Sequence, residues 1–417
     1  MAAAEPHEPQ VQVQFVTQLE ERWRVTEAPI QLPTRLTRFG LSEVVNHLLN
    51  APTPRPFDFL LQGELLRGPL SKSLARLGLS GEAAVVLEYI ELVPPPQPLL
   101  ACPHADWVSA LAAHPDGGHL LSGCYDHAAY VWDAALQSQA ELRAHRAPVK
   151  AVGWLPPAAG GALRALTASK DHTVRTWQVD RGGVRCEAVG SSHTAAVESL
   201  STNPAGSRFC SGGWDSSVCV WSAGEPAAAA DAPAAKRARG GGASLPPAEI
   251  HADVRLEGHR DCVSALCWPV AHLIYSASLD GSVREWDVTA SACSAQLGGQ
   301  KAALCVAVSL VNTCIATGHS DHAVRLWDTR LQQASLKLTL PHKGWVSSIS
   351  WATSSTHQLL TSCHDGGVRL WDIRSTLPLH ELHLHTDKAL CATWQNSSRI
   401  VSGGADGQLR VAEIPSA

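Results

Sequence analysis

The chain has 417 residues, of which 45% are hydrophobic and 17% are charged, and its formal net charge is −5. This composition excludes wholesale disorder, and the length predicts two to four domains or one large repeat array beside a smaller domain. A protein held to nucleic acid mainly by its own charge would be basic, so any RNA contact would have to be local or made through other proteins.

The twelve cysteines show no CxxC pair and no zinc-ligand spacing, and many of them lie in apolar stretches typical of strands. The first ten residues show no basic-then-apolar signal segment. Both features favour a reducing compartment, the cytosol or the nucleus. The longest uncharged run, 302–320, is better explained by two strands and a turn than by a membrane span, so we expect no membrane contact.

The first predicted elements belong to a small α+β domain over residues 11–93. Residues 11–15 alternate between apolar and polar side chains, which predicts a strand, and 23–25 is interpreted as its hairpin partner. Residues 41–49 carry apolar side chains at helical spacing, and Ser42 is a candidate cap for that helix.

The second half of this domain predicts a strand at 57–61, a turn at 62–64, a short helical turn at 71–77 and a last strand at 85–89. The order ββαββ in about 85 residues is that of a ubiquitin-like fold. A stiff proline-rich linker follows at 94–98. The domain does not look like a conjugated modifier, because it runs into this linker without a Gly-Gly pair.

Residues 99–415 contain a repeat marked by seven aspartates at spacings of 45, 44, 65, 41, 44 and 41 residues. A serine or threonine precedes each aspartate by four residues, a tryptophan follows the first six by six residues, and a histidine precedes six of the seven by 21–26 residues. The sets that have all four markers are His104, Ser122, Asp126 and Trp132; His145, Thr167, Asp171 and Trp177; His193, Ser211, Asp215 and Trp221; His259, Ser276, Asp280 and Trp286; and His342, Thr361, Asp365 and Trp371. The fifth unit has Gly298-Gly299 in place of the histidine, and the seventh has His385, Ser402 and Asp406 but Ala412 in place of the tryptophan.

Short strands with a period of 40–45 residues are typical of a β-propeller with one four-stranded blade per repeat. The markers resemble those of the WD-repeat family, whose Gly-His and Trp-Asp pairs stand here as Gly258-His259, Trp132-Asp133, Trp286-Asp287, Trp327-Asp328 and Trp371-Asp372. The expected fold class is therefore mainly β: a seven-bladed WD-repeat β-propeller preceded by a small α+β ubiquitin-like domain.

Serine, histidine and aspartate together could also indicate a hydrolase triad. The set recurs about seven times in one register, however, and an enzyme needs only one. In the WD-repeat family these side chains and the tryptophan form a hydrogen-bonded chain that ties the strands of a blade together, which satisfies their buried polar groups. We interpret the tetrads as structural and the tryptophans as blade core, and we expect no catalytic residue.

Ring closure can be predicted from the two ends of the repeat region. The last repeat ends soon after 408–413, so its outermost strand is absent from that end of the chain. Residues near 98–102 could supply this strand, which would remove an open sheet edge.

The spacing of 65 residues between Asp215 and Asp280 includes an insertion of roughly 20 residues. Residues 224–247 are rich in alanine, glycine and proline, which predicts a disordered loop. A basic cluster inside it is a candidate nuclear-import signal, although it could simply keep a low-complexity loop soluble. The cluster consists of Lys236, Arg237 and Arg239.

The first domain resembles the NLE domain, which is found ahead of propellers in ribosome-assembly factors, and residues 40–49 and 57–67 carry that match. With a seven-bladed propeller behind it, the chain resembles the WD repeat-containing protein 12 family. The related Notchless family also has an NLE domain but an eight-bladed propeller, and the seven aspartate markers argue against it.

This resemblance implies a non-catalytic scaffold in assembly of the large (60S) ribosomal subunit. Members of the family join Pescadillo and the block-of-proliferation protein in a trimeric complex on pre-60S particles, where maturation of the 28S/25S and 5.8S rRNA precursor requires them. Their propeller binds the block-of-proliferation protein, and their ubiquitin-like domain binds midasin, an AAA ATPase that strips the factor from the particle. The implied location is the nucleus, in nucleolus and nucleoplasm, which strengthens the import interpretation of the basic cluster.

The same resemblance implies one metal-site residue. In the family an acidic side chain shortly before the last strand completes the coordination of a Mg²⁺ held by midasin, and the matching residue is Glu82. Mg²⁺ prefers oxygen ligands in octahedral geometry, so a partner's carboxylate suits it and this chain needs no cofactor of its own. Glu64 is the main competitor, a solvated loop glutamate is the plain alternative, and Gly81 departs from the family pattern in a way that could loosen the loop.

Two other classes of function remain open. A ubiquitin-pathway adaptor would dock its ubiquitin-like domain on a proteasome or a ligase and would read a substrate with its propeller. An enzyme would need a unique constellation, and none stands out once the repeated tetrads are set aside. Propellers bind through face loops, and the sequence alone does not rank those loops.

Overall fold

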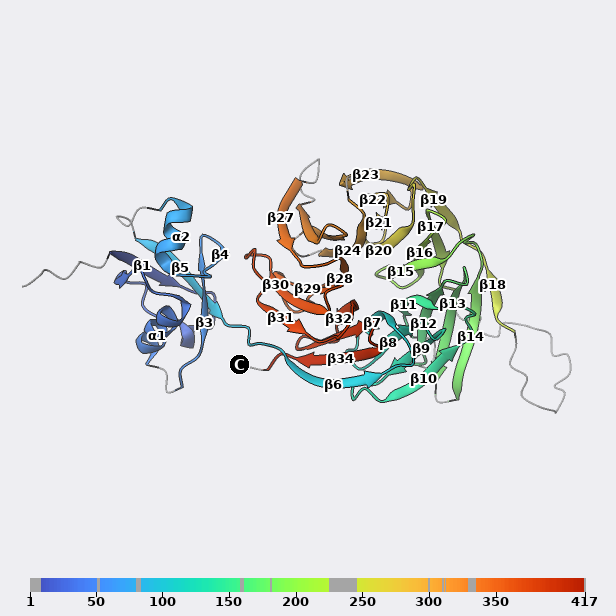
Figure 1. Cartoon of the computed structure of the whole chain (residues 1–417), viewed down its shortest axis with the longest axis horizontal. Coiled ribbons are helices and arrows are strands. Elements are labelled where there is room, and N and C mark those ends of the chain that lie inside the picture. The colour runs from blue at the N-terminus through green and yellow to red at the C-terminus, as the bar shows by residue number, and fades with distance from the viewer. Residues whose placement is uncertain are drawn as a thin grey trace, which may run out of the picture. The chain divides into compact units, whose positions relative to one another are not determined.

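The computed structural model describes residues 9–50, 53–79, 84–157, 161–180, 182–224, 246–298, 301–309, 311, 313–328 and 335–415. These residues form two compact units that divide between Pro95 and Pro96 (Figure 1). No helix in the described part of the chain is long and apolar enough to cross a membrane.

The first unit is a five-stranded sheet with the strand order β2-β1-β5-β3-β4. Its central pair, β1 and β5, is parallel, whereas β1 pairs with β2 and β5 with β3 in antiparallel fashion. Two helices and a 3₁₀ turn complete this small α+β unit, as the fold class predicts. Its elements are β1 (Gln10–Val16), η1 (Glu21–Trp23), β2 (Ile30–Pro33), α1 (Arg38–Leu49), β3 (Phe57–Leu61), β4 (Glu64–Leu65), α2 (Leu70–Leu77) and β5 (Val85–Glu91).

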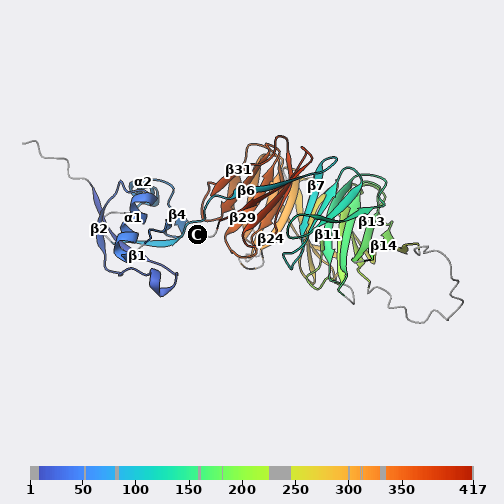
Figure 2. The same cartoon turned by 90° about the horizontal axis from the view of Figure 1, so that it is seen from below.

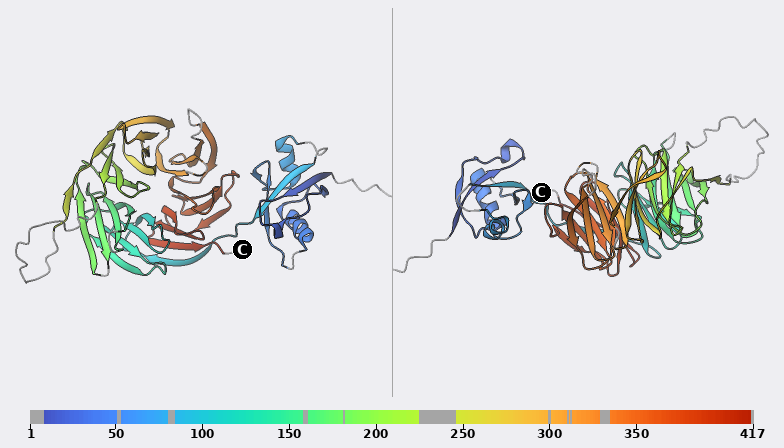
Figure 3. Two further views of the ribbon diagram at one scale, coloured as in Figure 1. Left: turned by 180° about the vertical axis from the view of Figure 1, so that it is seen from behind. Right: turned by 90° about the horizontal axis from the view of Figure 1, so that it is seen from above.

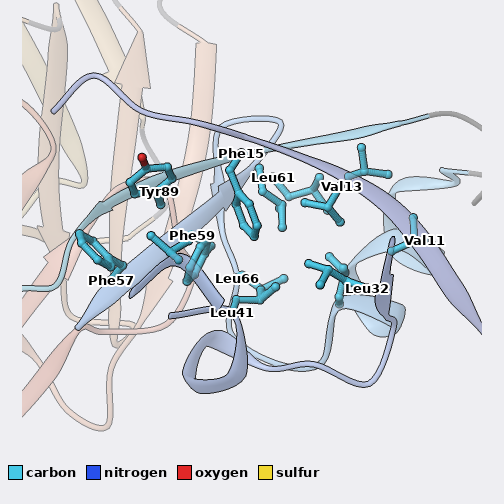
Figure 4. Close-up of a cluster of buried hydrophobic side chains, with 14 of the residues drawn as sticks. Val11, Val13, Phe15, Leu32, Leu41, Phe57, Phe59, Leu61, Leu66 and Tyr89 are labelled. Atoms are coloured by element: carbon cyan, nitrogen blue, oxygen red, sulfur yellow. The ribbon is translucent and has the colours of Figure 1, made fainter. Parts of the chain in front are cut away.

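The core of this unit lies between the sheet and the helices. Alternation along β1 buries Val11, Val13 and Phe15, which pack with side chains from β3, β5 and α1 (Figure 4). At one end of the core Phe57 packs edge-on against Tyr89, with ring centroids 5.5 Å apart. The Tyr89 hydroxyl is the polar end of this side chain, and it donates a hydrogen bond to the Trp23 backbone carbonyl at 2.6 Å.

Two local predictions in this unit are wrong. Residues 23–25 do not pair with β1, because the Tyr89 hydroxyl accepts the Val25 N–H at 3.0 Å and the partner of β1 is β2. Ser42 does not cap α1, which begins at Arg38. Its hydroxyl instead accepts the Phe57 N–H at 3.0 Å and so ties the helix to the start of β3.

The second unit contains seven sheets of four or five strands in its described residues, and we number them as blades in chain order. Blade 1 consists of β7 (Val108–Ala113), β8 (Leu120–Cys124), β9 (Ala128–Trp132) and β10 (Ser138–Arg143). Blade 2 consists of β11 (Val149–Leu155), β12 (Leu163–Ser169), β13 (Val174–Asp180) and β14 (Gly183–Gly190). Blade 3 consists of β15 (Val197–Thr202), β16 (Arg208–Gly213), β17 (Ser217–Ser222) and β19 (Val254–Glu257).

Blade 4 consists of β20 (Val263–Val270), β21 (Leu273–Ser278), β22 (Ser282–Asp287) and β23 (Ala292–Gly298). Blade 5 consists of β24 (Ala303–Ser309), β25 (Cys314–His319), β26 (Ala323–Asp328) and β27 (Ser335–Pro341). Blade 6 consists of β28 (Val346–Trp351), β29 (Gln358–Cys363), β30 (Gly367–Asp372) and β31 (His380–His383). Blade 7 consists of β32 (Ala389–Trp394), β33 (Arg399–Gly404), β34 (Gln408–Glu413) and β6 (Gln97–Pro103).

The first strands of the blades form a closed inner ring in which each contacts the next and β32 contacts β7 (Figure 1). The ring closes as predicted, because β34 pairs antiparallel with β6 from Gln408↔Pro103 to Glu413↔Gln97. The predicted propeller is therefore confirmed, with one blade built from both ends of the repeat region.

The insertion ends in a strand that the sequence did not indicate. After residues 225–245, which lie outside the described residues together with Lys236, Arg237 and Arg239, β18 (Ala248–Ile250) pairs parallel with β14 of blade 2. The chain then continues into β19 of blade 3. The strand β18 thus adds a fifth strand to the sheet of blade 2 before the chain returns to blade 3.

The antiparallel order of each blade separates its loops into two faces (Figures 2 and 3). The turn between the second and third strands and the connection from the last strand to the next blade share one face. We call this the aspartate face, because the seven marker aspartates lie in those turns. The turn between the first and second strands and the turn between the third and fourth strands share the opposite face.

Candidate interaction face of the propeller

Complete four-member tetrads occur in blades 2, 3 and 4. In each, the histidine Nδ1 lies 2.9–3.1 Å from the aspartate carboxylate and Nε2 lies 2.6–2.7 Å from the hydroxyl oxygen, to which the tryptophan Nε1 donates at 2.7–2.8 Å. The members are His145, Thr167, Asp171 and Trp177; His193, Ser211, Asp215 and Trp221; and His259, Ser276, Asp280 and Trp286.

In blades 1 and 6 the histidine reaches the hydroxyl but not the aspartate. His104 and His342 lie 2.9 Å from Ser122 and Thr361, and Trp132 and Trp371 donate to the same hydroxyls. The aspartates bond instead to the residue four positions later: Asp126 accepts the Tyr130 hydroxyl, and Asp365 accepts the Arg369 guanidinium.

Blade 5 uses a histidine that the marker spacing did not predict. His319 lies 2.8 Å from Thr317, which also accepts the Trp327 N–H at 2.9 Å. His319 follows Thr317 by two residues in β25, so the two side chains share one face of the strand. That spacing of two is the signal that would have found it. Blade 7 keeps the histidine, hydroxyl and aspartate contacts of His385, Ser402 and Asp406, at 2.8 and 2.9 Å.

The burial and charge of the tetrads fit a structural role. The hydroxyl-bearing residues are fully buried, so no substrate could approach them as nucleophiles. Burial raises the pKa values of Asp171, Asp215 and Asp280, but hydrogen bonds from histidine, hydroxyl and backbone groups outweigh it and hold these pKa values well below the usual range. These carboxylates are thus ionised and fully engaged.

On the aspartate face, one backbone hydrogen bond recurs in all seven blades. The residue before each marker aspartate donates its N–H, at 2.8–3.1 Å, to the carbonyl of the residue just before the first strand. This bond places two loop side chains next to each other in every blade. The donor and acceptor pairs are Tyr125 and Trp107, Lys170 and Pro148, Trp214 and Ala196, Leu279 and Cys262, Ser320 and Ala302, His364 and Trp345, and Ala405 and Lys388.

Three tryptophans outside the tetrads occupy these loop positions and are exposed, whereas the tetrad tryptophans of blades 1, 2, 3, 4 and 6 are buried in the blade core, as interpreted. The exposed fractions of Trp107, Trp214 and Trp345 are 39%, 52% and 49%. Trp107 lies 5.1 Å from Tyr125 and Trp345 lies 5.5 Å from His364 between ring centroids. Exposed tryptophans are unusual on a free surface and are enriched where proteins bind each other.

A polar network connects the aromatic side chains of blades 1, 2 and 3. Lys150 donates to the Tyr125 hydroxyl at 3.1 Å and pairs with Glu198 at 3.0 Å. Glu198 in turn accepts the Trp214 indole N–H at 2.9 Å. The exposed Lys170 ammonium lies 5.1 Å from the Tyr125 ring. Aromatic rings held by charged groups provide a rigid surface that loses little entropy on binding.

The predicted metal-site residue and its competitor belong to the first unit and not to the propeller. Glu82 lies outside the described residues, between α2 and β5. Its competitor Glu64 is engaged, because its carboxylate pairs with Arg76 of α2.

The chain matches two known domain families and several full-length relatives. Residues 11–74 match the NLE (NUC135) domain, and six segments match the WD domain, G-beta repeat: 97–133, 184–222, 253–287, 291–328, 334–372 and 376–412. Proteins named "Ribosome biogenesis protein WDR12 homolog" from Chlamydomonas reinhardtii, Oryza sativa subsp. japonica and Nematostella vectensis are 39%, 37% and 32% identical. Those alignments cover 96–97% of this chain and 96–98% of each relative. The chain belongs to the WDR12 family.

The structure of this WDR12-family chain contains one blade more than the six segments that match the WD repeat. Residues 134–183 lie between two matched segments, yet they supply most of blade 2 with its complete tetrad around Asp171. The aspartate spacing had predicted that unit, which brings the number of blades to seven.

Proposed function

We propose that this chain is a non-catalytic scaffold in ribosome biogenesis, acting in assembly of the large (60S) subunit and in maturation of the 28S/25S and 5.8S rRNA precursor. Membership of the WDR12 family supports a role in ribosome biogenesis. The exposed aromatic side chains of the aspartate face are the observation that supports a binding role. The tetrads supply no free nucleophile or base, because their hydroxyls are buried and occupied.

In this proposal the propeller binds the block-of-proliferation protein, which joins it to Pescadillo on the pre-60S particle. The exposed tryptophans of two aromatic pairs, Trp107 with Tyr125 and Trp345 with His364, are anchors of the kind that dominate protein interfaces. Asp106 caps its own loop by accepting the Trp107 N–H at 2.7 Å, which fixes the loop before any partner arrives.

The ubiquitin-like unit would bind midasin through Glu82. The carboxylate would complete the coordination of the Mg²⁺ that midasin holds. The metal would act only as a positively charged centre that both proteins coordinate. The pairing of Glu64 with Arg76 supports Glu82, because Glu64 would have to break an ion pair to reach a partner's metal. ATP-driven movement of midasin would then remove this chain from the particle.

Such a function places the protein in the nucleus, in nucleolus and nucleoplasm. The basic cluster Lys236, Arg237 and Arg239 would serve as the import signal.

The proposal is tested by affinity purification of the tagged full chain from nuclear extract, compared with Trp345→Ala and Leu377→Ala. Both side chains are exposed, but Leu377 lies between β30 and β31 and so on the face opposite to Trp345. We expect the wild-type chain and L377A to recover the block-of-proliferation protein, Pescadillo and pre-60S proteins, and W345A to recover several-fold less. Recovery of proteasome or ligase subunits without pre-60S proteins would replace this proposal with the ubiquitin-pathway adaptor.

A further inference from the structure

The turn between β7 and β8 of blade 1 carries three side chains whose potential ligand atoms face one another. Nδ1 of His114 lies 2.9 Å from one carboxylate oxygen of Asp116, and Nδ1 of His119 lies 3.0 Å from the other. All three ligand atoms lie within 4.8 Å of one another. No other group of three such side chains occurs among the residues that the structure describes.

Hydrogen bonds of the turn itself hold these side chains in place. The His114 N–H donates to the His119 carbonyl and the Gly117 N–H donates to the His114 carbonyl, both at 2.9 Å. The Gly118 N–H fixes the Asp116 carboxylate at 2.7 Å. The His114 ring packs edge-on against Trp154 of blade 2, with centroids 5.0 Å apart. A ligand set that is already ordered loses little entropy when it binds an ion.

The contacts of the turn also show where a cation would sit. Nδ1 of His114 lies 2.9 Å from the Asp116 carboxylate and 3.3 Å from the Asp116 backbone nitrogen. The shorter contact is the one that a protonated Nδ1 makes as a donor to a carboxylate. A divalent cation between the same atoms would take the place of that proton, because metal ligands bind in their deprotonated form.

We propose that His114, Asp116 and His119 bind a zinc ion. Two imidazole nitrogens and one carboxylate oxygen are ligands that Zn²⁺ accepts at about 2.0–2.2 Å in tetrahedral geometry, which puts ligand atoms a little over 3 Å apart. The observed 2.9 and 3.0 Å contacts reach different oxygens of the Asp116 carboxylate, so binding through one oxygen requires the carboxylate and the exposed His119 ring to turn. The side chains of Asp116 and His119 are 44% and 33% exposed, so a water or a partner's side chain can occupy the fourth position.

This site is independent of the two binding roles proposed above. The turn from first to second strand places it on the face opposite to the aspartate face. Its metal would belong to this chain, whereas the Mg²⁺ of the other proposal belongs to midasin. A zinc ion with one open position would fix the turn and offer a coordination point for a partner on the second face.

The test is zinc titration of the full-length chain by calorimetry, together with Co²⁺ as a spectroscopic probe. A Cys293→Ser background removes the exposed thiol, which could bind zinc by itself. His119→Gln and Asp116→Asn each remove one ligand, and the asparagine can still accept the Gly118 N–H. His251→Gln, at another exposed histidine, is the matched control.

We expect one zinc per chain, a Co²⁺ spectrum without thiolate charge-transfer bands, and at least a roughly tenfold loss of affinity in H119Q and D116N but not in H251Q. His119→Asp should restore part of the affinity, because it keeps a ligand at that position. Equal affinity in H119Q, thiolate bands in the Co²⁺ spectrum, or no binding by the folded background chain would each overturn the assignment.

Discussion

The side chain two positions after each marker aspartate separates the two tetrad arrangements. In blades 2, 3 and 4 that residue is Thr173, Ser217 or Ser282, and its hydroxyl donates to the aspartate at 2.6–2.9 Å. In blades 1 and 6, where the aspartate does not contact the histidine, the residue at the same position is Ala128 or Gly367. The hydroxyl therefore holds the carboxylate in the rotamer that faces the imidazole. In blade 7 that position is Gln408, and Asp406 faces His385 without such a hydroxyl.

Removal of this hydroxyl should weaken a blade. We expect Ser282→Ala to lower the free energy of unfolding by about 1–2 kcal/mol, because it deletes a buried hydrogen bond and frees Asp280 to turn toward Arg284, whose Nε has no partner in the structure. The measurement is thermal and urea unfolding of S282A beside Ser191→Ala, an exposed serine. Equal stability of the two variants would refute the role of the hydroxyl.

One tetrad histidine, His342, makes the propeller sensitive to acid. Burial lowers the pKa of His342 to about 4, whereas an unfolded histidine titrates near 6.5. The unfolded chain therefore takes up this proton first as the pH falls, so stability present above about pH 6.5 is lost progressively down to about pH 4. For this one group the loss amounts to about 3 kcal/mol at most.

A variant separates this effect from general acid unfolding. His342→Gln should be less stable at pH 7, because it loses the contact with Thr361, but its stability should fall less steeply between pH 6.5 and 4.5. The measurement is the urea midpoint across that range, with His251→Gln as an exposed control. Parallel curves for H342Q and the wild type would contradict the assignment.

At this scale the sequence identified the residues better than their partners. The repeat spacing identified Asp126 and Asp365 but not their hydrogen bonds to Tyr130 and Arg369. Which donor a carboxylate binds depends on the groups that the folded strand brings near it. Trp345 shows the same limit. A tryptophan predicts burial on average, and one placed just before an inner strand instead points into the loops.

At the scale of elements, small donors connect the first strands of neighbouring blades. Ser264 and Ser347 donate to the first carbonyl of the next inner strand at 2.7 and 2.6 Å, and the thiols of Cys305 and Cys391 make the same link at 3.5 Å. Burial raises the pKa of the Cys391 thiol to about 12, so it stays protonated and donates. These two cysteines therefore connect neighbouring blades of the ring by hydrogen bonds, which the composition did not indicate.

The ring also depends on its closing strand. A chain that begins at Pro96 keeps β6 and should unfold as cooperatively as the propeller of the full chain, whereas one that begins at Ala105 leaves β34 as an open edge. We expect the shorter chain to melt on the order of 5 °C lower or to aggregate. Differential scanning calorimetry compares the two chains, and equal melting of both would show that closure adds no stability.

The elements that the sequence predicted best are those that belong to the repeat. Marker spacing predicted all seven blades and the closing strand, since each blade must place the same side chains in the same order. Periodicity failed at 23–25, where Trp23 and Val25 alternate as well as Ile30 and Leu32 do. A hydroxyl 66 residues away, on Tyr89, decides between the two segments. The three-residue β18 has no periodicity of its own and forms only because β14 offers an edge.

At the scale of the whole molecule, the proposed function assigns separate binding roles to the two units. The aromatic anchors lie in the propeller and the proposed Mg²⁺ ligand lies in the ubiquitin-like unit. A scaffold that is both assembled and removed needs this separation, because the removing ATPase has to act while the other interface is still occupied.

The separation can be measured with variants of the two glutamates. We expect the full-length chain to bind the metal-dependent adhesion domain of midasin in Mg²⁺ but not in EDTA, because the carboxylate acts only as a metal ligand. Glu82→Ala should abolish that binding and Glu82→Asp should weaken it, because its carboxylate lies one methylene short. Glu64→Gln should bind as the wild type does, since Glu64 already pairs with Arg76.

Calorimetry with each variant gives the affinities, and all variants should retain the block-of-proliferation protein. Loss of binding in E64Q with retention in E82A would transfer the metal-ligand role to Glu64, and Mg²⁺-independent binding would remove that role altogether.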